Sequence, residues 1–389
     1  MFIFILLFDF YLKNMVFIFV GVLFLFFIFW FNKEFWQSKK VLLIFLTFFV
    51  LLIISLFVFF NEIDPIEIAF KRLIYVFSLF FISYYGFIVG INLSIHNSQK
   101  DNFFMFLLYV FLFNAIVTIM AWFITTGGIM ARYNFISPIN QATSGNIHLT
   151  TIGMLILFEN FNYKKLSSYL IFFIFLFNYF IAIVRAEQVI LIFSLFLYFL
   201  LRTKNKLHIR VFIFAIILFI TTIVLTLTNL FSYFISVFND NSAIVRSAAI
   251  RDAIRLFKRY PITGIGYGMY PFFKDSSILI ESVHNGIFGI MAETGIVGIV
   301  IFIIFMALII ATIYFLYNKS IIKNKYNTLI SVFLMGNILR SFFQNSFIFP
   351  PPQMSYYLCV MLVWIFVGII LKQKNFYKKH IPLKTTGYL

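Results

Sequence analysis

Long apolar stretches recur along the whole chain, and short polar segments separate them. We place these stretches at residues 2–12, 15–32, 41–60, 73–93, 103–126, 145–159, 166–184, 187–201, 209–231, 286–317, 327–348 and 353–371. Most approach the roughly 20 apolar residues that a helix needs to cross a bilayer. The pattern predicts an all-α integral membrane protein with about twelve transmembrane helices, forming one polytopic domain over residues 1–389. The first stretch lacks a basic region and a cleavage site, so we expect it to remain as the first helix.

Composition supports this interpretation and excludes a soluble fold. Hydrophobic residues make up 63% of the chain and charged residues 11%, whereas a soluble domain has about a quarter of its residues charged. The net charge of +17 follows the loops: alternate loops and the C-terminal tail hold eighteen Lys and Arg, against five in the short loops opposite. The positive-inside rule then predicts cytoplasmic termini. The basic charge therefore indicates topology, and we expect no nucleic-acid partner.

Residues 232–285 form the one segment between spans that is long enough to carry structure outside the bilayer. We expect this periplasmic loop to hold functional groups. Ile250, Ile254 and Phe257 recur at helical spacing and predict a helix over residues 242–260, which the following proline ends.

Arginines occupy two sides of this predicted helix. Arg251, Arg255 and Arg259 form a row at i+4 spacing, a pattern typical of a basic helix lying on lipid headgroups. Arg246 precedes Phe257 by eleven residues, which places it on the apolar side and directs it toward the membrane body. A cation in that position requires an anion.

Three glycines at alternate positions follow the helix: Gly264, Gly266 and Gly268. A phosphate-binding loop would need a preceding strand and a following Lys-Ser/Thr pair, and neither is present. A tight turn that returns the chain to the membrane explains the glycines at least as well.

His284 lies where the long loop re-enters the bilayer, next to Asn285. It is either a functional imidazole or a structural group that caps the helix starting near Asn285. Arg185 and Arg340 lie at membrane depth, where ionisable groups mark substrate paths or form structural pairs. For Arg340 the candidate partner is Glu293.

The outer side thus offers several cations, one histidine and few acids. Guanidinium groups match phosphate oxygens, so this set suits an anionic lipid headgroup such as a pyrophosphate. No Asp-x-Asp pair and no histidine cluster with ligand spacing occurs in the sequence. We therefore expect neither a metal nor another cofactor.

The same region resembles the signature of the O-antigen polymerase and ligase family. The resemblance covers about fifty residues and, more loosely, the whole chain. Two departures occur: Ile250 stands where many members have Trp, and Val184-Arg185-Ala186 replaces a Ser-Arg-Gly pattern. The matching runs are Val245-Arg246, Ile250-Arg251-Asp252-Ala253-Ile254, Tyr260-Pro261-Ile262-Thr263-Gly264-Ile265-Gly266-Tyr267-Gly268, His284-Asn285 and Glu293-Thr294-Gly295-Ile296-Val297-Gly298.

The resemblance implies a metal-independent glycosyltransferase of the membrane-embedded GT-C type. It would use oligosaccharides linked to undecaprenyl pyrophosphate at the periplasmic face of the bacterial inner membrane. By the same resemblance, Arg246 and Arg185 bind the pyrophosphate, and His284 orients or deprotonates the acceptor hydroxyl. Supporting roles are expected for Arg340, Glu293, Asn285, Gly264 and Gly266.

Several functions fit this inventory. We favour a polymerase over a ligase because residues with AT-rich codons, such as Phe, Tyr, Ile, Asn and Lys, are abundant, as in O-antigen gene clusters. A chain-length regulator and membrane lipid are then the expected partners. A transporter or flippase would show internal repeats with paired broken helices, and we find none. A scaffold explains neither His284 nor Arg340.

Overall fold

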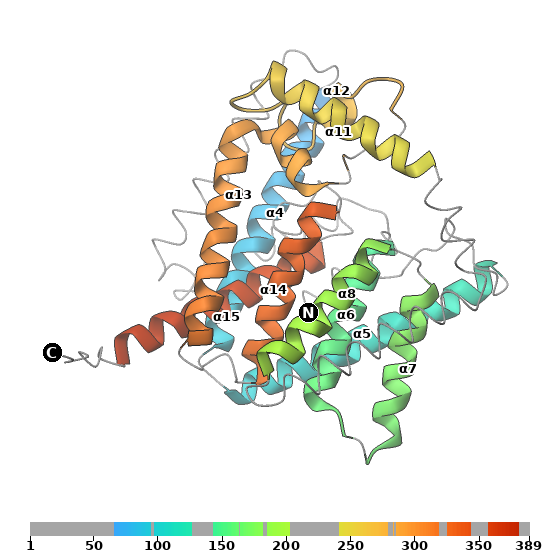
Figure 1. Cartoon of the computed structure of the whole chain (residues 1–389), viewed down its shortest axis with the longest axis vertical. Coiled ribbons are helices and arrows are strands. Elements are labelled where there is room, and N and C mark those ends of the chain that lie inside the picture. The colour runs from blue at the N-terminus through green and yellow to red at the C-terminus, as the bar shows by residue number, and fades with distance from the viewer. Residues whose placement is uncertain are drawn as a thin grey trace.

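In a computed structural model, the described part of the chain consists of helices and connecting segments, without a strand (Figure 1). The described residues are 66–94, 97–126, 143–162, 164–181, 185–202, 241–278, 283, 285–318, 325–343 and 357–380. The helices are α4 (Ile66–Leu93), α5 (Asn97–Thr126), α6 (Thr143–Asn160), α7 (Leu166–Ile181), α8 (Arg185–Arg202), α11 (Asn241–Arg259), α12 (Tyr270–Phe273), α13 (Gly286–Asn318), α14 (Lys325–Phe343) and α15 (Tyr357–His380).

These helices bear out much of the predicted segmentation. Eight of them (α4 to α8 and α13 to α15) coincide with predicted spans, and α11 matches the helix predicted in the long loop. Two stretches, Gln99–Phe123 and Gly286–Asn318, are long and apolar enough to cross a membrane by length and composition. The predicted spans 2–12, 15–32, 41–60 and 209–231 lie outside the described residues, and the number of crossings stays a prediction.

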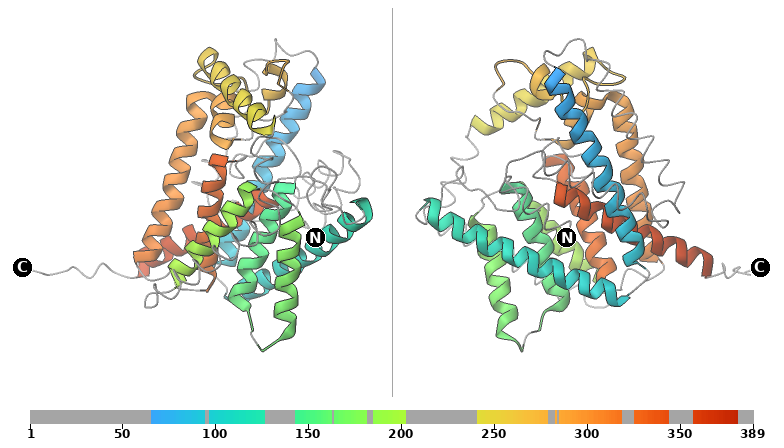
Figure 2. Two further views of the ribbon diagram at one scale, coloured as in Figure 1. Left: turned by 45° about the vertical axis from the view of Figure 1, so that its right-hand side comes forward. Right: turned by 180° about the vertical axis from the view of Figure 1, so that it is seen from behind.

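Helices α4 and α15 pack closely along much of their length (Figure 2). Glycines permit this approach: a methyl group added to Gly90 would collide with the Ile365 carbonyl, and one added to Gly368 would collide with the Phe87 carbonyl. Close backbone packing through small residues is typical of helices in membranes. The middle of α15, residues 359–370, is buried throughout.

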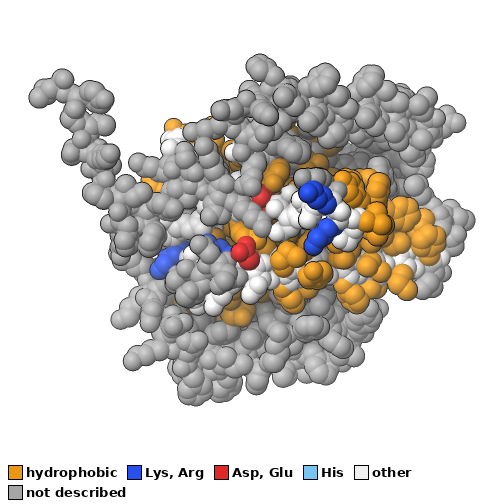
Figure 3. All heavy atoms as spheres, turned by 90° about the horizontal axis from the view of Figure 1, so that it is seen from below, with side chains coloured by type: hydrophobic (Ala, Val, Ile, Leu, Met, Phe, Trp, Pro, Cys, Tyr) orange, Lys and Arg blue, Asp and Glu red, His pale blue; other side chains and the backbone are white. Residues whose placement is uncertain are grey.

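Helices α5, α6 and α7 form a second group, and α14 packs against both α6 and α8. The turn between α6 and α7 lies at the lower end of the molecule, with α11 and α12 at the upper end (Figures 1 and 2). That turn carries exposed Lys164 and Lys165. Basic side chains emerge among hydrophobic ones on this lower face (Figure 3), the side for which the loop charges predict a cytoplasmic location.

Helix α13 is broken at Gly295, whose φ of 63° and ψ of −157° are not helical. An unbroken helix would pair the carbonyls of Ala292 and Glu293 with amides four residues later. In this protein, Ile265 N–H donates to the Ala292 carbonyl at 3.0 Å and Gly266 N–H to the Glu293 carbonyl at 2.9 Å. A segment about thirty residues away thus supplies donors at the break.

The amides beyond the break bond to the same segment. Ile296 N–H donates to the Pro261 carbonyl at 2.8 Å, and Val297 N–H donates to the Ile262 carbonyl at 3.5 Å. In a membrane protein, irregular backbone persists only where its polar groups are satisfied. Residues 261–266 therefore form an insert that holds the break open and fastens α11 to α13.

Substitution of Gly295 by alanine should destabilise this junction by about 2 kcal/mol or more, because the residue has a positive φ and a methyl group would collide with the Ile262 carbonyl. Gly289 provides a matched control on the same helix, since a methyl group there meets only Val283, at 4.0 Å. Gly289→Ala should keep or raise the midpoint of thermal unfolding in detergent, while Gly295→Ala lowers it. Equal midpoints would contradict the proposed role of the break.

Candidate functional site

Helix α11 packs against α13 through one side only. Ala249, Asp252, Ala253 and Leu256 are buried on that side, at the spacing of three and four residues that defines a helix face. The predicted row of Arg251, Arg255 and Arg259 lies on the exposed side. The exposed row agrees with the prediction, whereas Ile250, Ile254 and Phe257, which defined the predicted apolar side, are only half-buried.

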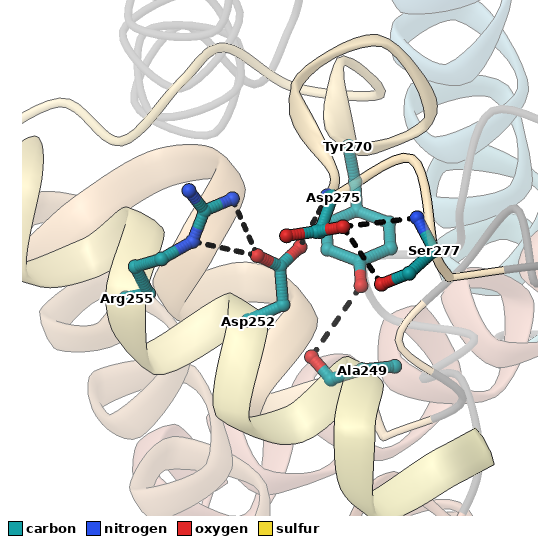
Figure 4. Close-up of polar contacts among 6 residues, drawn as sticks. All are labelled: Ala249, Asp252, Arg255, Tyr270, Asp275 and Ser277. Carbon is teal, nitrogen blue, oxygen red and sulfur yellow. Dashed lines mark hydrogen bonds and ion pairs between the residues drawn. The ribbon is translucent and has the colours of Figure 1, made fainter.

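Asp252 fastens the following segment to α11 (Figure 4). Its carboxylate forms an ion pair with Arg255 at 2.6 Å and accepts the Asp275 N–H at 3.3 Å. The Tyr270 hydroxyl donates to the Ala249 carbonyl at 3.4 Å. Burial raises the pKa of Tyr270, and the nearby Asp252 carboxylate raises it further, so the phenol stays neutral. The Arg255 side chain is 54% exposed, and such pairs contribute little to stability.

Arg246 differs from its prediction in one respect. It shares a helix side with Ala253, seven residues on, as expected, and also with Ala249, three residues on. Its side chain is nevertheless exposed, whereas Ala249 and Ala253 are completely buried. The buried stretch of this side begins at Ala249, and Arg246 lies one turn before it. Arg246 is thus an accessible cation at the end of a packed face.

The glycines after α11 make a turn. Gly264, Gly266 and Gly268 have φ values of 65°, 99° and 76°, which glycine adopts without strain. The Gly264 N–H donates to the Tyr260 carbonyl at 3.1 Å, and the Gly266 N–H is bound at the α13 break. Because these amides are already engaged, they do not form a phosphate cradle. Gly264 and Gly266 instead bring the chain against Glu293.

Asn285 caps α13. Its Oδ1 accepts the N–H groups of Ile287 and Phe288, each at 3.1 Å, the geometry expected of an N-cap residue. His284 lies outside the described residues, but the cap that we considered as its alternative role is made by Asn285. The Asn285 Nδ2 also donates to the Phe342 carbonyl at 2.8 Å, which ties the start of α13 to the end of α14.

Arg340 lies in the last turn of α14 with 1% of its surface exposed. On the same helix, Gly336 faces Ile190 and Ser194 of α8: a methyl group there would lie 2.9 Å from Ser194 Oγ and 3.5 Å from Ile190 Cγ2. The upper ends of these helices are the end of α14 and the start of α8 (Figures 1 and 2).

Arg340 lies about 6 Å beyond Gly336, and Arg185 about 7.5 Å before Ile190, at 1.5 Å per residue. Arg340, in the last turn of α14, and Arg185, at the start of α8, therefore both lie toward the upper ends of their helices. The structure describes Arg185 only through its backbone, as the first residue of α8.

The described geometry joins several predicted site residues. Asn285 is bonded to the residue two positions after Arg340, and Gly266 is bonded to Glu293. Sequence reasoning missed Asp252, although its spacing of three residues from Arg255 signals a helical ion pair. Among the described residues, no group of three or more His, Cys, Asp or Glu could hold a metal ion.

Replacing Asn285 separates its two roles. Asn285→Ala removes the cap, at a cost of about 1 kcal/mol, and the bond to Phe342, at a cost of about 1 kcal/mol. Asn285→Ser keeps a capping oxygen but cannot reach Phe342 with a donor. Thermal unfolding in detergent should rank the proteins wild type, Ser, Ala in falling stability. Equal stability of the two variants would contradict the capping role.

Comparison with known families agrees with this arrangement. Residues 170–303 match a family model described as O-antigen ligase. The match includes the start of α8, all of α11 and the broken part of α13. No curated protein matches the chain. Members of the matched family are glycosyltransferase-like integral membrane proteins. The match over residues 170–303 confirms the predicted resemblance to the O-antigen polymerase and ligase family.

Proposed function

We propose that this protein is an O-antigen polymerase that joins oligosaccharide repeat units linked to undecaprenyl pyrophosphate at the periplasmic face of the inner membrane. The observation that carries the proposal is the family match over residues 170–303, which contains Arg185, Arg246 and His284. The exposed side chain of Arg246 supports it, because a donor-binding cation must be accessible. The tie between Asn285 and α14 supports it too, since it fixes the backbone next to His284.

In the proposed reaction, Arg246 and Arg185 bind the pyrophosphate of the donor through charged hydrogen bonds. His284 accepts the proton of an acceptor hydroxyl, a task suited to imidazole near neutral pH. The hydroxyl oxygen forms a bond to the anomeric carbon as the bond from that carbon to phosphate breaks. Undecaprenyl pyrophosphate leaves with the electron pair, and the arginines stabilise its added charge.

A ligase is the second candidate, and it is the activity named in the description of the matching family model. A ligase would use the same donor and transfer the glycan to the lipid A core. Deleting the gene and separating the lipopolysaccharide on a gel distinguishes the two. Core carrying one repeat unit supports the polymerase. Bare core with lipid-linked polymer accumulating supports the ligase, and an unchanged ladder refutes both.

Two arginines of α11 should differ in effect, although both are exposed. Arg246→Ala should lower polymer formation a hundredfold or more, because a donor-binding cation is lost. Arg255→Ala should leave substantial activity, since Arg255 pairs with Asp252 at the surface. Polymer length and protein level would be measured for both variants. Equal losses of polymer at equal protein level would argue against a special role for Arg246.

His284→Ala should reduce transfer by about a hundredfold to ten-thousandfold, the usual contribution of a general acid or base. Binding of an undecaprenyl pyrophosphate analogue should persist, because it depends on the arginines. Asn and Gln at position 284 should not restore transfer, since neither accepts a proton near neutral pH. Wild-type chain length from either variant would rule out a catalytic base.

We also expect transfer to be independent of divalent metal, because guanidinium groups would supply the positive charge at the pyrophosphate. Purified protein given a lipid-linked donor should keep its rate in EDTA. A rate that falls in EDTA and returns with magnesium or manganese would contradict this expectation.

A further inference from the structure

A histidine outside the proposed site is buried between two helices. His148, on α6, is 1% exposed, and its Nε2 lies 3.2 Å from Asn337 Nδ2 of α14. The same Asn337 Nδ2 donates to the Phe333 carbonyl at 3.0 Å. A carbonyl only accepts, so this atom is the amide nitrogen, and it must donate to His148 as well. In this contact the Nε2 of His148 therefore acts as the acceptor.

This contact belongs to a set of hydrogen bonds that leads to the start of α13. The Ser341 Oγ donates to the Asn337 carbonyl at 3.0 Å, within the last turn of α14. The next residue, Phe342, offers its carbonyl to Asn285 Nδ2 at 2.8 Å. Asn285 is adjacent in the chain to His284, and consecutive Cα atoms are about 3.8 Å apart. The end of α14 thus links His148 to the backbone beside residue 284.

We propose that His148 and Asn337 are positioning residues for the glycosyl transfer: they fix the last turn of α14, to which Asn285 anchors the backbone next to His284. This inference rests on the proposed function. His148 itself touches neither donor nor acceptor in this account. Its role is to accept a hydrogen bond in the buried contact between α6 and α14.

Loss of that acceptor has a defined physical consequence. A buried amide N–H without a partner costs about 1 to 3 kcal/mol, so Asn337 would turn or α14 would shift to satisfy it. The 1% exposed Arg340 lies in the same last turn and would move with it. Displacing a reacting group by about 1 Å can lower a rate about a hundredfold. Turnover should therefore suffer more than folding.

A matched control exists on the same helix. Asn178 Nδ2 of α7 donates to Thr150 Oγ1 of α6 at 2.7 Å, and both residues are buried. Like the His148 contact, this is a buried hydrogen bond from α6 to a neighbouring helix. It leads to α7 and not to α14. Thr150→Val removes its acceptor with almost no change in side-chain shape.

The test compares His148→Leu, His148→Gln and Thr150→Val in the full-length protein. Each is assayed for elongation of a lipid-linked repeat unit per folded molecule, for binding of an undecaprenyl pyrophosphate analogue and for thermal midpoint. His148→Leu should lose about tenfold to a hundredfold in turnover with donor binding unchanged. The turnover of Thr150→Val should stay within about twofold of wild type, although its thermal midpoint should be similar to that of His148→Leu. His148→Gln should recover most of the turnover, because its Oε1 can replace Nε2 as the acceptor.

Equal turnover of His148→Leu and Thr150→Val would overturn the inference, and so would failure of His148→Gln to recover. If His148→Leu does not accumulate, Asn337→Ala removes the same bond from its other side and should reproduce the loss of turnover. Wild-type protein that elongates no lipid-linked unit would refute the proposed function instead.

Discussion

The described architecture depends on how the backbone N–H and carbonyl groups at the break in α13 find hydrogen-bond partners. A helix in an apolar environment has no water to accept or donate where its hydrogen bonds are interrupted. Here residues 261–266 contribute two donors and two acceptors at the break. Gly264 and Gly295 both have positive φ, and neither has room for a side chain, so the two backbones cross in contact. This contact connects α11, and Arg246 with it, to the part of α13 that follows His284.

Charge and burial divide the upper side of the molecule into two kinds of group. Exposed cations on α11 remain in reach of an anionic headgroup, and one of them, Arg255, is compensated by Asp252. Within the helices, Arg340, Asn337 and His148 are each 1% exposed, where burying polar groups is costly unless they are bonded. Such groups hold a backbone in one place, whereas the exposed cations can bind a ligand.

Local sequence patterns predicted many of the helices. They did not predict the contacts between segments that are distant in the sequence. Periodicity and Pro261 placed the helix over residues 242–260, and the structure has it at Asn241–Arg259. The break at Gly295 was not predicted, because residues 286–317 were assigned to one span and the segment that bonds to the break lies elsewhere in the chain. Asn285 is a better helix cap than histidine by its chemistry, so the cap was available from sequence.

Burial was less predictable than helix phase. Helical phase put Arg246 on the same side of α11 as Ala253, but phase does not say how far along a helix its packing extends, and the Arg246 side chain is exposed. His148 was passed over because its partner, Asn337, is 189 positions away. Arg340 was recognised as unusual from its depth in an apolar segment. The bond from Asn285 to Phe342, two residues after Arg340, could be found only from the fold.

The exchange of hydrogen bonds between residues 261–266 and the α13 break also bears on how such proteins can be recombined. A chimera that takes residues 241–278 from one relative and the long helices from another divides this exchange between two parents. Backbone hydrogen bonds can form with almost any residue type, but the crossing of the two backbones requires glycine at positions 264 and 295. Residues 241–278 should therefore be exchanged together with residues 286–298. A crossover point is better placed after the break, within the second half of α13.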